Sequence, residues 1–439
     1  MRAGGAHQKD PMPRDRRTIL IISQVYPPDA AAVGQHFHDV AAALVKRGRP
    51  VKVITSARGY DDATQTYPAR ETRDGVEIRR LPLSSFGKAS IPVRLLAQML
   101  FLVQAIVHGL FTRNLGSLFV STSPPMCAAG ALVIHALRRV PLTYWVMDVN
   151  PDQVIELGKM KPGALPCRVM RLFQRAVLKR AKDVVVLDRF MGERINRMRD
   201  VSEKLSIIPP WAHDDVLESI EHADNPFREE HALQGRFVVM YSGNHGFSTP
   251  VTTVLDAAVR LKDREDVVFA FIGGGVGKED VRRTIAEHNP GNIIDLPYQP
   301  LESIKYSLSA ADLHVVTVGP DVVGVVHPCK VYGAMAVARP ILLVAPDPCH
   351  ASDLIAAHDI GWHVAHGDTD ACVQAIERAI EAGEERRREM GASAKAAVDG
   401  DLHSTTSIAR VCDVIERGLP DTPGPTRKPS PVPAHEHAA

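Results

Sequence analysis

The chain has 439 residues, a length at which two large domains are the commonest arrangement. Hydrophobic residues make up 45% and charged residues 23%, and the net charge of +1 excludes a disordered polymer and gives no basic footprint for nucleic-acid binding. The six cysteines form no CxxC pair and no zinc spacing. We therefore expect reduced thiols, no metal and a cytoplasmic protein, because the N-terminal segment also lacks the pattern of a signal peptide.

From Thr18 the chain alternates apolar, strand-like runs with helical patterns. The predicted strands cover residues 18–23, 51–55, 118–121, 142–147 and 183–187. The predicted helices cover residues 35–47 and 128–138. Because the strands are near-continuous apolar runs, we expect a parallel sheet that is covered on both faces. The pattern predicts a disordered tail at 1–16 and an N-terminal Rossmann-like α/β domain at 17–205.

Residues 91–111 form an unusually apolar stretch with a single charged residue. The stretch is long enough to span a bilayer, but two glutamines and a histidine interrupt it, and a span would place the two halves of one sheet on opposite sides of the membrane. A helix lying in the membrane interface and a helix buried in the core are the two simpler interpretations. In the interfacial case, Leu96, Phe101 and Leu102 are expected to face the lipid.

The second half of the chain repeats the α/β pattern after a linker at 206–226 that contains two adjacent prolines. The predicted strands cover residues 237–241, 267–272, 293–296, 313–318 and 341–344. The predicted helices cover residues 251–262, 278–288, 301–310, 330–338, 370–382, 384–398 and 405–417. These elements predict a second Rossmann-like domain at 227–417, facing the first across a cleft, and a disordered, proline-rich tail at 418–439.

Two glycine-containing turns follow predicted strands of the second domain. The run 273–278 has neither the Walker A spacing nor the dinucleotide fingerprint, which predicts an ordinary tight turn. The segment 241–246 is better placed for backbone N–H groups to bind an anion at a helix N-terminus, although a turn without a ligand fits the spacing too. Its four candidate binding residues are Gly243, Asn244, His245 and Gly246. Gly34 holds the corresponding place in the first domain, with the same two alternatives.

Six segments, taken in chain order, resemble the retaining glycosyltransferases of family 4, in the bacterial branch that assembles O-antigen, capsule and colanic-acid-type polysaccharides. The segments are 23–29 with Gly34, 121–125, 146–152, 207–211, 241–246 and 327–340. The resemblance implies a GT-B fold, a nucleotide sugar as donor in the second domain, and no metal or other cofactor. It also implies a polyisoprenyl-linked or glycan acceptor in the first domain. Such an acceptor would fit the interfacial interpretation of residues 91–111, with peripheral contact to the inner face of the cytoplasmic membrane.

Three further residues become site candidates through this resemblance. Lys330 stands at a predicted helix N-terminus, where its ammonium and the helix dipole would both face the donor diphosphate, unless it is only a solvated surface lysine. His327, on the preceding loop, would contact the sugar or a phosphate, or would only pack the loop. Asp148 follows a strand and would orient the acceptor or act as a base, or would only cap a turn.

The sequence departs from the family at two positions. Many members carry two glutamates eight positions apart that contact the donor sugar and the ribose, and the matching residues here are Val325 and Gly333. Three classes of function therefore stay open: sugar transfer to a lipid-linked or glycan acceptor, a UDP-sugar 2-epimerase of the same fold, and a non-catalytic protein that binds nucleotide sugars.

Overall fold

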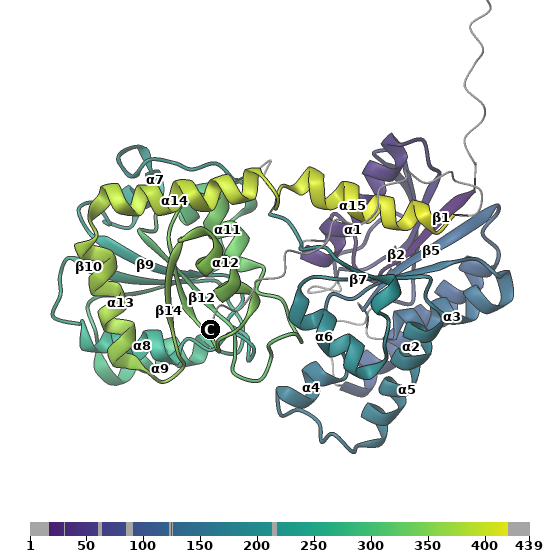
Figure 1. Ribbon diagram of the computed structural model, residues 1–439, viewed down its shortest axis with the longest axis horizontal. Coiled ribbons are helices and arrows are strands. Elements are labelled where there is room, and N and C mark those ends of the chain that lie inside the picture. Colours follow the sequence, from purple (N-terminus) through teal and green to yellow (C-terminus); the bar gives the residue numbers. More distant parts are fainter. Residues whose placement is uncertain are drawn as a thin grey trace, which may run out of the picture.

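The computed structural model describes residues 17–29, 31–59, 64–84, 91–122, 124, 126–212 and 217–419. Two α/β domains lie side by side, each built on one central sheet, as Figure 1 shows. The prediction of two tandem Rossmann-like domains is confirmed. The predicted tail at 1–16 lies outside the described residues, as does the predicted tail at 418–439 apart from its first two residues.

The first domain is built on a sheet in the order β3-β4-β2-β1-β5-β6-β7-β8, in which all neighbours are parallel except β3 and β4. Its strands are β1 (Thr18–Ile22), β2 (Val51–Ser56), β3 (Arg70–Arg73), β4 (Val76–Leu81), β5 (Leu115–Ser121), β6 (Leu142–Trp145), β7 (Asp183–Val186) and β8 (Leu205–Ile207). Its helices are α1 (Ala32–Lys46), α2 (Ile91–Leu110), α3 (Cys127–Arg138), α4 (Asp152–Glu156), α5 (Leu165–Arg180) and α6 (Arg189–Met198).

The second domain is built on a parallel sheet in the order β11-β10-β9-β12-β13-β14. Its strands are β9 (Phe237–Ser242), β10 (Val267–Ile272), β11 (Ile293–Leu296), β12 (Leu313–Thr317), β13 (Ile341–Val344) and β14 (Gly361–Val364). Its helices are α7 (Pro226–Glu230), α8 (Thr252–Arg260), α9 (Lys278–His288), α10 (Ile304–Ser309), α11 (Lys330–Ala336), α12 (His350–His358), α13 (Thr369–Glu381) and α14 (Gly383–Asp399).

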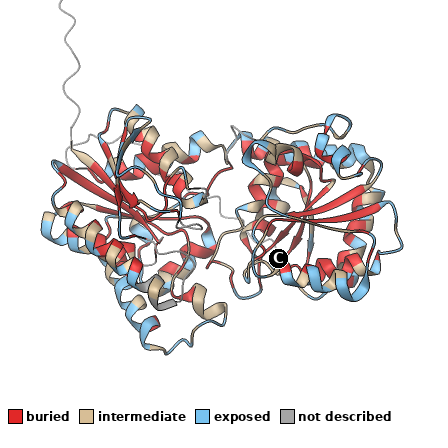
Figure 2. Ribbon diagram, turned by 180° about the vertical axis from the view of Figure 1, so that it is seen from behind, coloured by how far each residue is buried: buried red, intermediate tan, exposed pale blue. Residues whose placement is uncertain are grey.

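The core of each domain is its sheet, and helices cover both faces. Every residue of β5 and of β10 is buried, which is why β10 is a continuous apolar run and β5 carries only the small residues Gly116, Ser117 and Ser121 among its apolar ones. Figure 2 shows the buried strands at the centre of each domain and the exposed surface on the outer sides of the helices. This packing leaves the loops after the strands free to form a site between the domains.

The last helix, α15 (Ser404–Arg417), returns to the first domain and packs against α1, as Figure 1 shows. Glu416 accepts hydrogen bonds from Arg47 and Arg49, at 2.8 Å and 2.7 Å. In addition, β8 pairs with β7, so the first sheet extends into the predicted linker. Residues 206 and 207, predicted as linker, thus extend the first sheet, and residues 404–417, predicted in the second domain, pack on the first, because strand pairing and ion pairing join segments that the sequence separates.

Helix α2 presents one face to the core and the other to solvent. Phe101 and Leu102 are buried beneath it, whereas Leu96 is 56% exposed. The expectation that all three face a lipid surface is therefore wrong for Phe101 and Leu102, because the helix rests on the sheet through that face. Among the described residues, no helix combines the length and apolar character that a membrane span requires.

Candidate active site

Two neighbouring cavities lie where the second domain faces the first. One has a volume of about 200 Å³ and is lined from the first domain by Asp148 and Gln153 and from the second domain by residues that include Asn244 and Lys330. The other has a volume of about 270 Å³ and lies at the carboxyl ends of β9, β10 and β12. Lys330 lines both cavities, which places its ammonium where the two meet.

Lys330 is the first residue of α11, as predicted. Its Nζ lies 5.3 Å from the centre of the Tyr241 ring, and it has no ion pair or hydrogen bond within the described part of the chain. Gly243 makes room for it, because a Cβ at position 243 would lie 2.5 Å from Lys330 Cε. The side chain is thus held between an aromatic face and a glycine, with its charge available to an anion.

Asp148 lies in the same cavity on the side of the first domain. Its backbone N–H donates to Thr122 Oγ1 at 3.0 Å, and the Gln153 amide donates to its carboxylate at 3.4 Å. Burial raises the pKa of Asp148 to about 6, since the charged carboxylate is disfavoured away from water. A carboxyl group with this pKa can accept a proton close to neutral pH.

His327 has a different environment from the one predicted. Its Nδ1 lies 2.6 Å from the Asp188 carboxylate of the first domain, and its Nε2 lies 2.9 Å from the Tyr332 hydroxyl, which in turn contacts His350. Burial alone would raise the pKa of Asp188, but the hydrogen bond and the charge of His327 bring its pKa below the ordinary value. Both ring nitrogens of His327 are thus occupied and join the two domains, while His327 also lines the 200 Å³ cavity, so its predicted contact with the sugar or a phosphate stays a prediction.

The backbone amides of the loop 243–246 mainly donate hydrogen bonds to other groups of the same chain. The amides of Gly243, His245 and Gly246 donate to Ile272 O, Gly274 O and Thr249 Oγ1. The prediction that this loop presents its amides to an anion is therefore wrong for three of its four residues. Asn244 lines the 200 Å³ cavity, and Gly243 lines the 270 Å³ cavity.

The His245 ring is fully buried and lines neither cavity. Its Nδ1–H donates to Gly243 O at 3.1 Å, which leaves Nε2 as an acceptor without a partner among the described residues. Burial and the nearby charge of Lys278 lower the pKa of His245 to about 4, so the ring is neutral. The predicted hydrogen bond from His245 to a phosphate is not supported by this arrangement.

Gly34 and the run 273–278 serve packing. A Cβ at position 34 would lie 3.0 Å from the backbone of Tyr26, and Gly34 lines neither of these two cavities, which favours the alternative of a tight turn. A Cβ at Gly273 would lie 2.1 Å from Gly243 O. The tight turn predicted for 273–278 is confirmed, because its glycines let two loops meet backbone to backbone.

Comparison with protein families divides the chain into the same two domains as the two sheets do. Residues 31–211 match the glycosyl transferase 4-like domain, and residues 224–397 match the glycosyl transferases group 1 domain. Two successive domains of one enzyme class thus account for most of the chain. The chain is a glycosyltransferase.

Two curated proteins are similar to this glycosyltransferase. WbjE of Pseudomonas aeruginosa, named a probable glycosyltransferase, is 27% identical over 57% of the chain and 63% of its own length, which is just under two thirds. WcaI of Escherichia coli K12, named as a candidate colanic acid biosynthesis glycosyl transferase, is 24% identical over 74% of the chain and 83% of its own length. The resemblance to family 4 is confirmed, and the comparisons do not favour the epimerase or the non-catalytic binder.

Solved structures share the fold of the glycosyltransferase. Sucrose-phosphate synthase from Thermosynechococcus elongatus superposes with a TM-score of 0.73 at 16% identity, covering 92% of this chain and 99% of that one. Anabaena HepE, in complex with UDP and glucose, superposes with a TM-score of 0.67 at 14% identity, covering 91% and 99%. The GT-B fold is therefore confirmed.

The two positions that lack the family glutamates have different surroundings in the glycosyltransferase. Val325 is fully buried, and its carbonyl accepts a hydrogen bond from Val149 of the first domain at 2.9 Å. Gly333 lines the 270 Å³ cavity, where a Cβ would meet only Leu308 at 3.8 Å. None of the described residues that line this cavity is acidic.

Sequence reasoning missed several polar residues of the two cavities. They are Gln153, Ser242, Ser248, Thr249, Tyr298, Gln299, His314 and Thr317. Four of them stand at or directly after the ends of predicted strands, and strand ends are where such folds bind ligands. That signal would have found Ser242, Tyr298, Gln299 and Thr317. In the part of the chain that the structure describes, no three His, Cys, Asp or Glu residues cluster closely enough to hold a metal ion.

Proposed function

We propose that this glycosyltransferase moves a sugar from a nucleotide-diphosphate donor to a lipid-linked or glycan acceptor in cell-surface polysaccharide biosynthesis, with retention of configuration and without a metal. The observation that carries the proposal is the cavity in which Asp148 and Lys330 face each other from opposite domains. On one side lies the Lys330 ammonium, which has no carboxylate partner among the described residues and suits a leaving diphosphate. On the other side lies the Asp148 carboxylate, whose raised pKa suits it to accept a proton from an attacking hydroxyl.

The donor would occupy the 270 Å³ cavity with its nucleoside and place its diphosphate beside Lys330. As the bond to the sugar breaks, negative charge develops on the diphosphate, and a fixed ammonium stabilises that charge more than it stabilises the ground state. The short helix α11 begins at Lys330, but the N–H groups of Val331 and Tyr332 already donate to Pro328 O and Cys329 O, so the Lys330 side chain supplies this effect. Lys330 would thus do the work that a metal ion does in other transferases.

The acceptor would approach from the first domain. Asp148 would accept a hydrogen bond from the attacking hydroxyl, and Gln153 and the Thr122 contact hold the Asp148 loop in place. Asn244, on the other side of the cavity, would contact the donor sugar or a phosphate. The WcaI name, which points to an exopolysaccharide, supports a glycan-building role.

The outer face of α2 supports peripheral contact with a membrane. Leu96, Met99, Val103 and Val107 share the face that points away from the sheet, and all are about half exposed. Exposed apolar stripes of this kind are costly in water and typical of interfacial helices. A polyisoprenyl-linked acceptor would be met at such a surface.

The test is incubation of the purified protein with a panel of nucleotide sugars, with and without bacterial membrane extract, while released nucleotide and labelled glycolipid are measured. We expect nucleotide release from one donor to rise when extract is added, and the rate to persist in excess EDTA. A rate that EDTA abolishes and Mg²⁺ restores would contradict the metal-free mechanism. Incorporation of solvent deuterium into the sugar without transfer would instead indicate an epimerase.

A further inference from the structure

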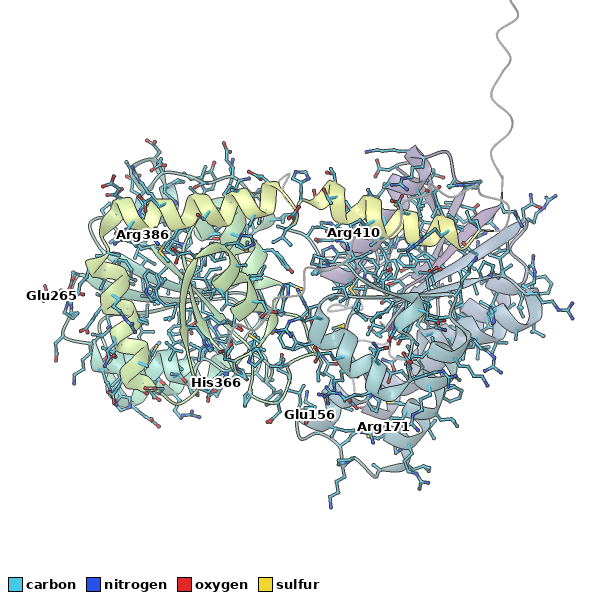
Figure 3. The ribbon with its side chains drawn as sticks, viewed as in Figure 1. Glu156, Arg171, Glu265, His366, Arg386 and Arg410 are labelled. Carbon is cyan, nitrogen blue, oxygen red and sulfur yellow. The ribbon has the colours of Figure 1, made fainter. Side chains whose placement is uncertain are left out.

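A third cavity, of about 440 Å³, lies in the first domain between α4, α5 and α6. Its lining is almost entirely basic and consists of Asp152, Arg171, Arg175, Arg194, Arg197 and Met198. Figure 3 shows Glu156 and Arg171 close to each other at the lower end of this domain. We call this cavity the arginine pocket.

Two of the four arginines are fixed by carboxylates. Asp152 is buried and accepts from Arg194 Nε at 2.8 Å and from Arg171 Nη2 at 3.4 Å, and Glu156 pairs with the other end of Arg194. Arg175 and Arg197 are exposed and have no hydrogen bond or ion pair among the described residues. With four guanidinium groups against two carboxylates, the arginine pocket keeps two positive charges.

An apolar surface borders the arginine pocket. Helix α5 exposes Leu165, Val169, Leu172 and Phe173, which repeat at helical spacing on the side away from the core, while Arg168, Arg175 and Lys179 follow one flank of that stripe. Helix α3 packs against both α5 and α2 and exposes Val133 and Leu137. The exposed apolar face of α2 thus continues over α3 and α5 up to the arginine pocket.

The arginine pocket also adjoins the active site. In α4, Gln153 lines the cavity that holds Asp148, and its neighbour Asp152 lines the arginine pocket. Asp148 and Asp152 are four positions apart in the chain, so their Cα atoms are at most about 14 Å apart even for an extended chain. A single amphiphilic molecule can therefore reach from the apolar surface through the arginine pocket to the reacting centre.

We propose that the arginine pocket binds the diphosphate of a lipid-linked acceptor, whose hydrocarbon chain lies along the exposed faces of α5, α3 and α2. This inference rests on the proposed transfer to such an acceptor. The two unpaired guanidinium groups match the two charges of a diphosphate diester, and their planar forks suit phosphate oxygens. A concave cavity with one buried carboxylate in its wall suits one discrete group and not the dispersed charge of a bulk anionic bilayer.

The test measures binding of the full chain to vesicles in the absence of any donor. Three compositions are compared: phosphatidylcholine alone, phosphatidylcholine with a polyisoprenyl diphosphate, and phosphatidylcholine with phosphatidylglycerol at the same total charge. We expect the polyisoprenyl diphosphate to increase the affinity of the wild-type chain for the vesicles. The double variant Arg175→Ala/Arg197→Ala should bind the diphosphate vesicles about tenfold more weakly than the wild type, because hydrogen bonds between charged partners are lost. Both side chains are exposed, so thermal melting should stay unchanged.

The matched control is Arg168→Ala/Lys179→Ala, which removes the same charge from exposed positions of α5 outside the arginine pocket. Less than a twofold loss in this control supports the proposal. Equal losses in both variants, or equal recruitment by phosphatidylglycerol, overturn it in favour of general attraction to anionic lipid. Because this binding needs no donor, a failure of sugar transfer itself appears separately, as wild-type binding to the diphosphate vesicles without nucleotide release.

Discussion

Lys330 is the residue on which the proposed chemistry depends most. Replacing it with Ala removes the cation that lies where the two cavities meet. We expect this variant to lose about 2 to 4 kcal/mol of transition-state stabilisation, or roughly 30-fold to 1000-fold in turnover. Nucleotide release measured at saturating donor checks the prediction, and Lys330→Arg should restore part of the rate because it retains the charge. Turnover close to wild type in Lys330→Ala would show that the diphosphate lies elsewhere.

Asp148 should impose a pH dependence on the same reaction. Burial raises its pKa to about 6, and a base must be ionised to accept a proton. We therefore expect kcat to be constant above this pKa and to fall about tenfold for each pH unit below it. A pH profile of nucleotide release checks this, and Asp148→Asn should remove both the rate and the acid limb. An acid limb at the ordinary aspartate value of about 4 would instead indicate a solvated carboxylate.

At the scale of elements, α2 has two faces that should respond differently to mutation. Replacing Leu96, Met99 and Val103 with Ser should release the protein from phosphatidylcholine vesicles while thermal melting stays near wild type, because these side chains already contact water. Each large apolar side chain that the bilayer removes from water contributes at most about 1.5 to 3 kcal/mol to the free energy of vesicle binding. The control is Phe101→Ala on the buried face, which should cost about 3 to 5 kcal/mol of folding free energy. If the triple variant still binds the vesicles, α2 does not form the membrane contact.

At the scale of the whole molecule, α15 ties the C-terminal end of the fold to the first domain. Glu416 is the shared acceptor for Arg47 and Arg49, and the Arg49 side chain is only 8% exposed. Glu416→Gln leaves that cation largely buried without a carboxylate, so we expect a loss of about 1 to 3 kcal/mol, less than for a fully buried pair. Urea unfolding checks the value. Asp413→Asn is the matched control, because Asp413 pairs with Arg47 at an exposed position and should cost under about 1 kcal/mol. Equal losses would mean that α15 is held by its apolar contacts alone.

The sequence alone determined the elements whose residues are buried on both faces. Strand β10 is apolar throughout because helices cover both faces of the sheet, so its position could be read directly, whereas only 118–121 of β5 was predicted, since Gly116 and Ser117 interrupt its apolar run. Edge strands gave no such signal: β3 reads ArgGluThrArg and is half exposed. Lys330 could likewise be placed from the sequence, since a helix start is a local property of the chain.

Only the tertiary structure decided which candidate side chains face the cavities and which serve packing. His327 stood on the expected loop and lines a cavity, yet contacts with Asp188 and Tyr332 occupy both of its ring nitrogens, whereas the His245 ring is buried and lines neither cavity. The same holds for α15 on α1 and for the arginine pocket, whose members come from three separate helices. A pattern of spacing reports the neighbours of a residue along the chain, whereas a partner more than a hundred positions away is brought to it only when the sheets and helices pack.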